Sequence, residues 1–190
     1  MSNIQNYLTD DINNFITTLQ KPDNPYYHLP AKTGVTDLGK SLNLGFSNFA
    51  IKTYYTTKKW EDFDDTKKNN WVSNINEFQV ETNQLPNNSF IDPPLLSFYK
   101  NPTVLKLTKR YIKKNLQFLN SINYESPEIE IEKMVRAETK QSISTLFQIG
   151  ERNKNIYLDF PHSEIEIKKF IDSFNWDFPW NAGAHFASLC

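Results

Sequence analysis

The stretch WVSNINEFQ, residues 71–79, decides the fold class, because its pattern recurs in the chain. Its tryptophan, isoleucine and phenylalanine share one face of a helix, which predicts an α-helix with a narrow apolar stripe. Residues 16–20 (ITTLQ) and 171–175 (IDSFN) repeat its ending, in which two polar residues stand between isoleucine and a large apolar residue, and a carboxamide follows. A loop begins after each of these endings. The recurrence predicts a chain built from repeated helices.

Helical spacing covers most of the remaining sequence. Residues 44–55 are apolar nearly all round, which predicts a buried helix. Gly150 suits a left-handed cap after a long helix, and Ser163 with Glu166 forms a capping box. Pro102 is expected at the first position of another helix. The sequence predicts helices at residues 12–19, 44–55, 71–79, 104–122, 128–149 and 163–174, and no segment alternates convincingly enough for a strand.

Two kinds of helix alternate along the chain. Residues 44–52 (LGFSNFAIK), 136–147 (RAETKQSISTLF) and 182–189 (AGAHFASL) begin with small residues among apolar ones. The helices with the repeated ending have more polar faces. Because small residues let helices approach closely, we expect an inner ring of buried helices and an outer ring of half-exposed ones.

This combination resembles the α/α-toroid superfamily of terpenoid cyclases and protein prenyltransferases. The W-x3-I-x2-F-Q stretch at Trp71–Gln79, followed by NNSFIDP, is similar to a degenerate Gln/Trp repeat of those cyclases. The resemblance extends from about residue 40 and implies helix hairpins wound into a ring around a central cavity. The sequence supplies too few helices to close a ring, so we expect residues 1–190 to form a single toroid domain with an incomplete ring. The natural chain is then expected to continue past Cys190 and this part to self-associate through its open repeat end.

Residues 62–66 spell D-x-D-D-T, the string with which one class of terpenoid cyclases protonates its substrate. In those enzymes the string lies in an apolar cavity. Here four lysines lie within ten residues of it, and no apolar helix follows. We interpret the string as a solvated linker whose carboxylates titrate near their ordinary pKa of about 4, with Asp65 or Thr66 capping the next helix.

Residues 136–141 (RAETKQ) supply one set of candidate site residues. Glu138 is a candidate general acid or base, and Arg136 could hold a substrate carboxylate through two hydrogen bonds. Gln141 is a candidate substrate-binding residue on the same helix. The alternative for this stretch is an interhelical salt bridge.

Residues 176–185 (WDFPWNAGAH) supply a second set. Trp180 offers a ring for stacking, Asn181 an amide for hydrogen bonding, and His185 a catalytic imidazole among small neighbours. A helix cap at Asn181 with ordinary core packing is the alternative. Two further substrate-binding candidates are His28, between tyrosines and prolines, and Asp92 in the FIDPP stretch; a packed loop is the alternative for His28.

Composition narrows the classes of partner and cofactor. Lys and Arg (21) nearly balance Asp and Glu (22), so no basic field favours nucleic acid. No apolar run is long enough to span a membrane, and the N-terminal stretch does not read as a signal peptide, so we expect a cytoplasmic protein. The three histidines and single cysteine lack metal-ligand spacing, and no nucleotide-binding motif is present. No metal or cofactor is therefore expected.

Aromatic side chains, 14% of the chain, are interleaved with Asn, Gln, Arg and Glu. Rings stack on sugars and these polar groups hydrogen-bond to hydroxyls, so the leading hypothesis is a toroid that binds or processes a saccharide in a central cleft. It would be an enzyme if Glu138 and His185 converge. One alternative is a cyclase-like or prenyltransferase-like protein acting on an isoprenoid in a mostly apolar cavity. The other is a non-catalytic helical scaffold.

Overall fold

The computed structural model describes residues 2–81, 85–116, 118–119, 124–161, 163–174, 176–177 and 179. These residues form eight α-helices, a short 3-10 helix and a two-stranded antiparallel hairpin, so the all-α prediction is confirmed and the hairpin is an unpredicted addition. The elements in chain order are α1 (Ser2–Thr17), α2 (Asp37–Ser41), α3 (Leu44–Thr56), η1 (Lys59–Asp62), α4 (Asp65–Asn76), β1 (Gln79–Val80), β2 (Ser89–Phe90), α5 (Pro93–Lys100), α6 (Val104–Asn115), α7 (Pro127–Gln148) and α8 (Glu164–Asp172).

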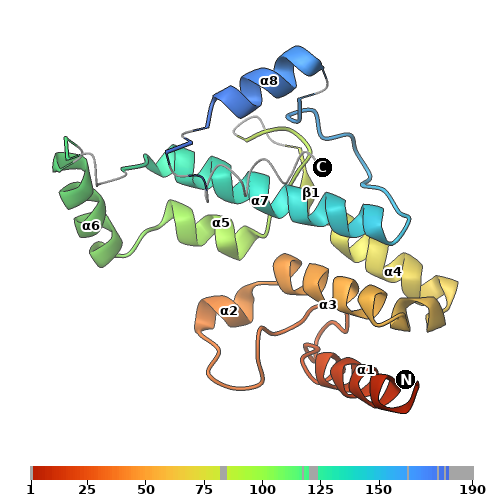
Figure 1. Cartoon of the computed structure of the whole chain (residues 1–190). Coiled ribbons are helices and arrows are strands. Elements are labelled where there is room, and N and C mark those ends of the chain that lie inside the picture. Colours follow the sequence, from red (N-terminus) through yellow and green to blue (C-terminus); the bar gives the residue numbers. More distant parts are fainter. Residues whose placement is uncertain are drawn as a thin grey trace.

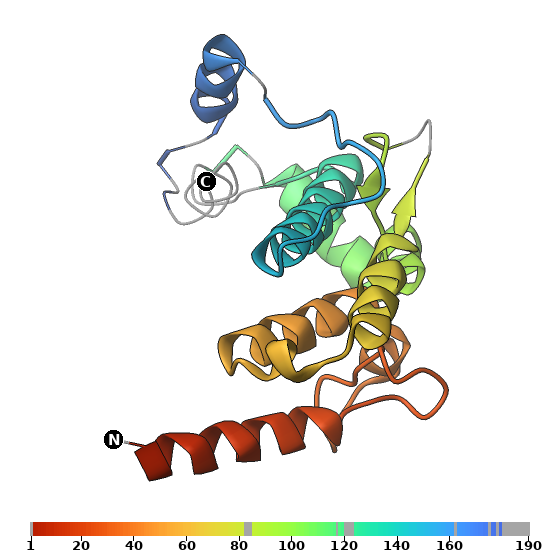
Figure 2. The same ribbon diagram turned by 90° about the vertical axis from the view of Figure 1, so that its right-hand side faces the viewer.

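Helices α3 and α7 form the centre of the fold (Figure 1). The start of α3 lies beside Gln141 of α7, and Lys52, near its other end, donates to Ser144, so the two helices run in the same direction. Helices α1 and α4 and the 3-10 helix pack on α3, whereas α5 and β2 pack on α7. Figure 2 shows the resulting order, with α1, α3, α7 and α8 succeeding one another from one end of the molecule to the other.

The larger hydrophobic core lies between α3, α4 and η1, and Trp71 is its central residue. The rings of Tyr26 and Tyr54 meet Trp71 edge to face, with centroids 5.1 and 6.1 Å away. A smaller core forms between α7 and α5 around Ile91, Met134 and Val135. Most of the aromatic residues of the first half of the chain therefore fill the core rather than line a cleft.

Local sequence signals placed several helix ends correctly. Gly150 has a φ of +82° and ends α7, and Ser163 and Glu166 form the predicted capping box at α8. The predicted helix at residues 44–55 is α3, but only its inward face is buried, since Phe49 is 57% exposed. The prediction for Pro102 was wrong: Thr103 is the N-cap of α6, whose first residue is Val104. Two helices, α2 and α5, lie in stretches for which no helix was predicted.

The D-x-D-D-T string lies on the surface at the start of α4. Asp64 is the N-cap, and its carboxylate accepts a hydrogen bond of 2.7 Å from the backbone N–H of Lys67. The cap was predicted one or two residues later, at Asp65 or Thr66, so that assignment was wrong. Phe63 within the string and Trp60 just before it are buried and anchor the segment. The exposure of the acidic residues agrees with a capped linker.

The apolar stripe predicted for residues 12–19 is only partly buried. Leu19 lies in the core, but Phe15 on α1 is 49% exposed. The helix itself is confirmed, and it packs on α3 through a narrow contact.

Candidate functional site

The site is built on Asp92, which connects β2 to α5 and is 1% exposed. Its side chain does not cap α5. Instead, Oδ2 accepts hydrogen bonds from the backbone N–H groups of Asn43 and Leu44, at 2.6 and 2.9 Å. These donors lie at the start of α3, where Asn43 makes no side-chain cap of its own. Because the first N–H groups of a helix lack internal partners and carry partial positive charge, Asp92 completes α3 from a distant part of the sequence.

Opposing effects act on the pKa of Asp92. Burial raises the pKa of this carboxyl group, whereas the N–H groups of Asn43 and Leu44 and the charge of Lys21 lower it; burial prevails. Lys21 donates to the carbonyl of Leu42 and to Oδ1 of Asn43, so it ties the chain just before α3. The second oxygen of Asp92, Oδ1, has no hydrogen-bond partner among the described residues.

Glu138 lies on α7 opposite the first turn of α3. A methyl group added at Gly45 would lie 3.7 Å from its Oε1 and 4.0 Å from its Oε2, so the α3 backbone passes close to the carboxyl group. Burial, reinforced by the charge of Asp92, raises the pKa of Glu138 to about 7. We call Asp92 and Glu138 the carboxyl pair. Near neutral pH, Glu138 can therefore either donate or accept a proton.

Polar side chains continue from the carboxyl pair along the contact between α3 and α7. Gln141 donates through Nε2 to the carbonyl of Gly45 at 3.3 Å. One turn along α3, Asn48 donates to the hydroxyl of Ser142 at 2.9 Å. On the other side of α7, Thr139 accepts from the backbone N–H of Phe90 at 2.9 Å. The contact between the two central helices is therefore a hydrogen-bonded seam.

Arg136 does not face the carboxyl pair. Its guanidinium group binds Asp159 at 2.9 Å through Nε and Glu132 at 2.9 Å through an Nη atom. Asp159 lies in the segment that follows α7, whereas Glu138 faces α3. Arg136 therefore forms salt bridges, but within α7 and to a loop segment rather than between two helices, and the structure does not place it with Glu138. The sequence could not distinguish the two because both residues lie on one predicted helix.

His28 lies in the core rather than beside the carboxyl pair. Its ring stacks on Trp71 with centroids 5.5 Å apart, and it is 2% exposed. Burial lowers the pKa of His28 to about 4, and the backbone of Tyr26 offsets this only in part. An imidazole that is neutral and packed in this way fits the alternative of a packed loop.

Three candidates, Trp180, Asn181 and His185, lie outside the described residues, so their roles stay predictions. The described part of the candidate site therefore consists of Asp92, Glu138 and Gln141. Gly45 was not predicted as a site residue, although the small residues of its stretch indicated a close helix contact. Among the described residues, no group of three or more His, Cys, Asp or Glu side chains could hold a metal ion.

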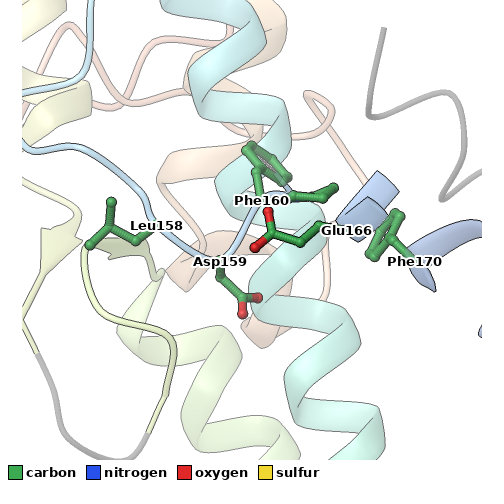
Figure 3. A pocket seen from close by; sticks show the side chains of 6 residues that line it. Leu158, Asp159, Phe160, Glu166 and Phe170 are labelled. Carbon is green, nitrogen blue, oxygen red and sulfur yellow. The ribbon is translucent and has the colours of Figure 1, made fainter. Parts of the chain in front are cut away.

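Two surface pockets lie away from the carboxyl pair. One, of about 270 Å³, lies between α8 and the segment that follows α7 (Figure 3). Its lining residues are Leu158, Asp159, Phe160, Pro161, Glu166 and Phe170. The other, of about 240 Å³, is lined by Arg110, Lys113, Tyr124, Glu125 and Glu130. The carboxylates beside the first pocket are already engaged, Asp159 by Arg136 and Glu166 by the α8 cap, so neither is free to bind a ligand's charge.

Within the described part of the chain, no helix has the length and apolar character needed to cross a lipid bilayer. No protein-family model, curated protein or solved structure matches this sequence. The geometry of the carboxyl pair is therefore the main basis for a functional hypothesis.

Proposed function

We propose that this chain has an α/α-toroid arrangement and binds a saccharide at the carboxyl pair, with Glu138 as the acid–base residue. The observation that carries the proposal is the convergence of Asp92 and Glu138 at the start of α3, next to Gln141. Enzymes that cleave glycosidic bonds commonly use two carboxyl groups that differ in pKa. In such enzymes one carboxyl group donates a proton and the other acts as a carboxylate.

The toroid part of the proposal draws on the orientation of the central helices. Repeated helix hairpins place every second helix in the same direction, and α3 and α7 run in the same direction and pack together. Both also belong to the stretches predicted as inner helices. Helices α1 and α4, which carry the repeated endings or precede them, pack on α3.

The polarity of the site favours a saccharide over an isoprenoid. A cyclase-like site needs a largely apolar cavity with one isolated acid. Here the acids are accompanied by polar groups, the side-chain amide of Gln141 and the carbonyl of Gly45 to which it donates. Such groups match the hydroxyl groups of a sugar better than a hydrocarbon chain.

The test is ligand-observed NMR with a panel of neutral and acidic oligosaccharides, and with farnesyl diphosphate as the isoprenoid representative. We expect saturation transfer from the protein to at least one oligosaccharide, with binding weakened about tenfold or more in Glu138→Gln. The matched control is Glu132→Gln, on the same helix but paired with Arg136, which should leave binding within about twofold.

Two results would overturn the proposal in different ways. Binding of farnesyl diphosphate alone, lost in Glu138→Gln, would assign the pair to an isoprenoid site. Binding of neither class would leave the carboxyl pair as a structural link between α3 and α7, as expected for a scaffold.

A further inference from the structure

Helix α6 is a strongly amphipathic basic helix at the edge of the molecule (Figure 1). Its sequence, VLKLTKRYIKKN, contains five basic residues and no acidic one, although the whole chain has a formal net charge of −1. The positive charge is therefore concentrated on this helix. At 100° per residue, the apolar side chains gather on one side and the basic ones on the other.

The basic side of α6 faces the rest of the protein. Arg110 and Lys106 both contact Oε2 of Glu130 on α7, at 2.6 and 3.1 Å. The ammonium group of Lys106 also lies 4.4 Å from the centroid of the Tyr99 ring on α5. These contacts fix how α6 is rotated about its own axis.

The apolar side of α6 consequently points away from the protein. Its five large side chains are all at least 50% exposed, and Val104 reaches 80%. They are Val104, Leu105, Leu107, Tyr111 and Ile112. A helix of an ordinary domain turns this side toward the core, so an exposed apolar side indicates a surface that binds an external partner.

The distribution of charge indicates which kind of partner binds the apolar side of α6. Lys109 and Lys114 lie at the two borders of the apolar side, and neither pairs with an acid among the described residues. Lysines at the borders of an apolar face can extend to lipid headgroups while the face enters the acyl region. Twelve residues with this pattern are typical of a helix that lies in the plane of a membrane and does not cross it.

We propose that α6 docks the protein on an anionic lipid surface, with Val104, Leu105 and Tyr111 inserted and Lys109 and Lys114 at the headgroups. A second copy of the chain is the competing occupant. Helix α1 also exposes apolar side chains, such as Tyr7 and Phe15. It carries only two acidic residues, Asp10 and Asp11, so its charge matches the basic helix less well than a continuous anionic surface.

The experiment is co-sedimentation of the chain with phosphatidylcholine vesicles, with and without one third phosphatidylglycerol. We expect binding to the anionic vesicles at least about tenfold tighter than to the neutral ones, and weaker binding as salt is added. The charge variant Lys109→Glu/Lys114→Glu and the apolar variant Leu105→Asn/Tyr111→Asn should each weaken binding about tenfold or more. All four positions are exposed, so circular dichroism should show a folded protein in both cases.

Lys154→Glu/Lys169→Glu is the matched control, with the same change in charge at exposed positions outside α6. It should bind the anionic vesicles within about threefold of the unmodified chain. Failure to bind anionic vesicles, or equal binding by the control and the two α6 variants, would overturn the proposal. It would also be overturned if vesicle-free sedimentation showed self-association that Leu105→Asn/Tyr111→Asn abolishes, since a second copy would then cover the face.

Discussion

The carboxylate of Asp92 caps a helix that begins 48 residues earlier, by accepting a hydrogen bond of 2.9 Å from the backbone N–H of Leu44. This bond joins the loop before α5 to the start of α3 and holds the negative charge beside Glu138. The side chain of Asp92 therefore stabilises the start of α3 and also raises the pKa of Glu138.

Asp92→Ala tests the structural part of this relationship. The substitution leaves the N–H groups of Asn43 and Leu44 without their acceptor in a buried position, which should lower the free energy of unfolding by about 2–4 kcal/mol. Urea denaturation measures the change. Asp65→Ala, an exposed position on α4, is the control and should stay within about 0.5 kcal/mol. A loss as small as that of the control would show that the long-range cap contributes little.

Glu138 and His28 should make stability depend on pH with opposite signs. The folded pKa of Glu138, about 7, lies above its ordinary 4.5, so the folded state holds the extra proton and stability falls as pH rises through this window. The folded pKa of His28, about 4, lies below its ordinary 6.5, so stability falls as pH drops from 6.5 to 4. Each contribution is at most about 3 kcal/mol. The raised pKa of Asp92 acts in the same sense as that of Glu138.

Two single variants separate these contributions. In Glu138→Gln the fall in stability toward pH 7 should disappear, and the variant should exceed the unmodified chain at pH 8 by up to about 3 kcal/mol. In His28→Phe, which keeps a ring against Trp71, the loss of stability below pH 6.5 should disappear instead. Guanidinium denaturation across the pH range measures both. An unchanged pH profile in Glu138→Gln would show that this carboxyl group is not perturbed by folding.

Gly45→Ala distinguishes a binding site from a structural contact. The added methyl group lies 3.7 Å from Oε1 of Glu138, an ordinary contact distance, so the fold should keep its stability or gain up to about 1 kcal/mol. A saccharide bound at the carboxyl pair should nevertheless bind more weakly, because the added methyl group contacts the carboxyl group of Glu138. Calorimetry and ligand-observed NMR measure the two effects.

Gly150→Ala is the matched control for this substitution. Gly150 has a φ of +82°, so alanine there should cost about 1 kcal/mol, through backbone strain, and leave ligand binding unchanged. If Gly45→Ala destabilised the fold as much as Gly150→Ala did, α3 and α7 would have no room for the methyl group, which would contradict the spacing between Gly45 and Glu138.

Asp64 provides a test of the acidic string at α4. Asp64→Asn should change stability by less than about 0.5 kcal/mol because asparagine caps helices as well as aspartate does. Asp64→Ala should cost about 1 kcal/mol, since the N–H of Lys67 loses its acceptor. Thermal denaturation compares the two. Equal and negligible effects of both changes would contradict the capping role.

The sequence predicted features that depend on residues within one or two helical turns. The capping box at Ser163, the left-handed Gly150 and the position of α3 are of this kind. The role of Asp92 as a cap of α3 could not be predicted from the sequence. Its partners at the start of α3 lie far away in the sequence, and its own position suggests a cap for α5. Arg136 was misleading for the same reason, since its partner Asp159 lies 23 residues away.

In the candidate site, too, local features could be predicted from the sequence, whereas contacts between distant residues could not. Glu138 could be selected from sequence as a carboxylate on a helix with an apolar continuation, but its raised pKa depends on burial and on the charge of Asp92, both of which the fold provides. His28 was selected for its tyrosine and proline neighbours, and these neighbours instead bury it against Trp71. Burial and pairing, which decide whether a titratable residue is reactive, are properties of tertiary structure.

The carboxyl pair keeps a proton near neutral pH. A carbon-13 NMR titration of the glutamate carboxyl signals tests this protonation directly. Glu138 is assigned by the signal that Glu138→Gln removes. We predict a midpoint near pH 7 for this signal, which moves to lower pH in Asp92→Asn, since the neighbouring negative charge is then gone. A midpoint near the ordinary 4.5, with no response to Asp92→Asn, would contradict the account.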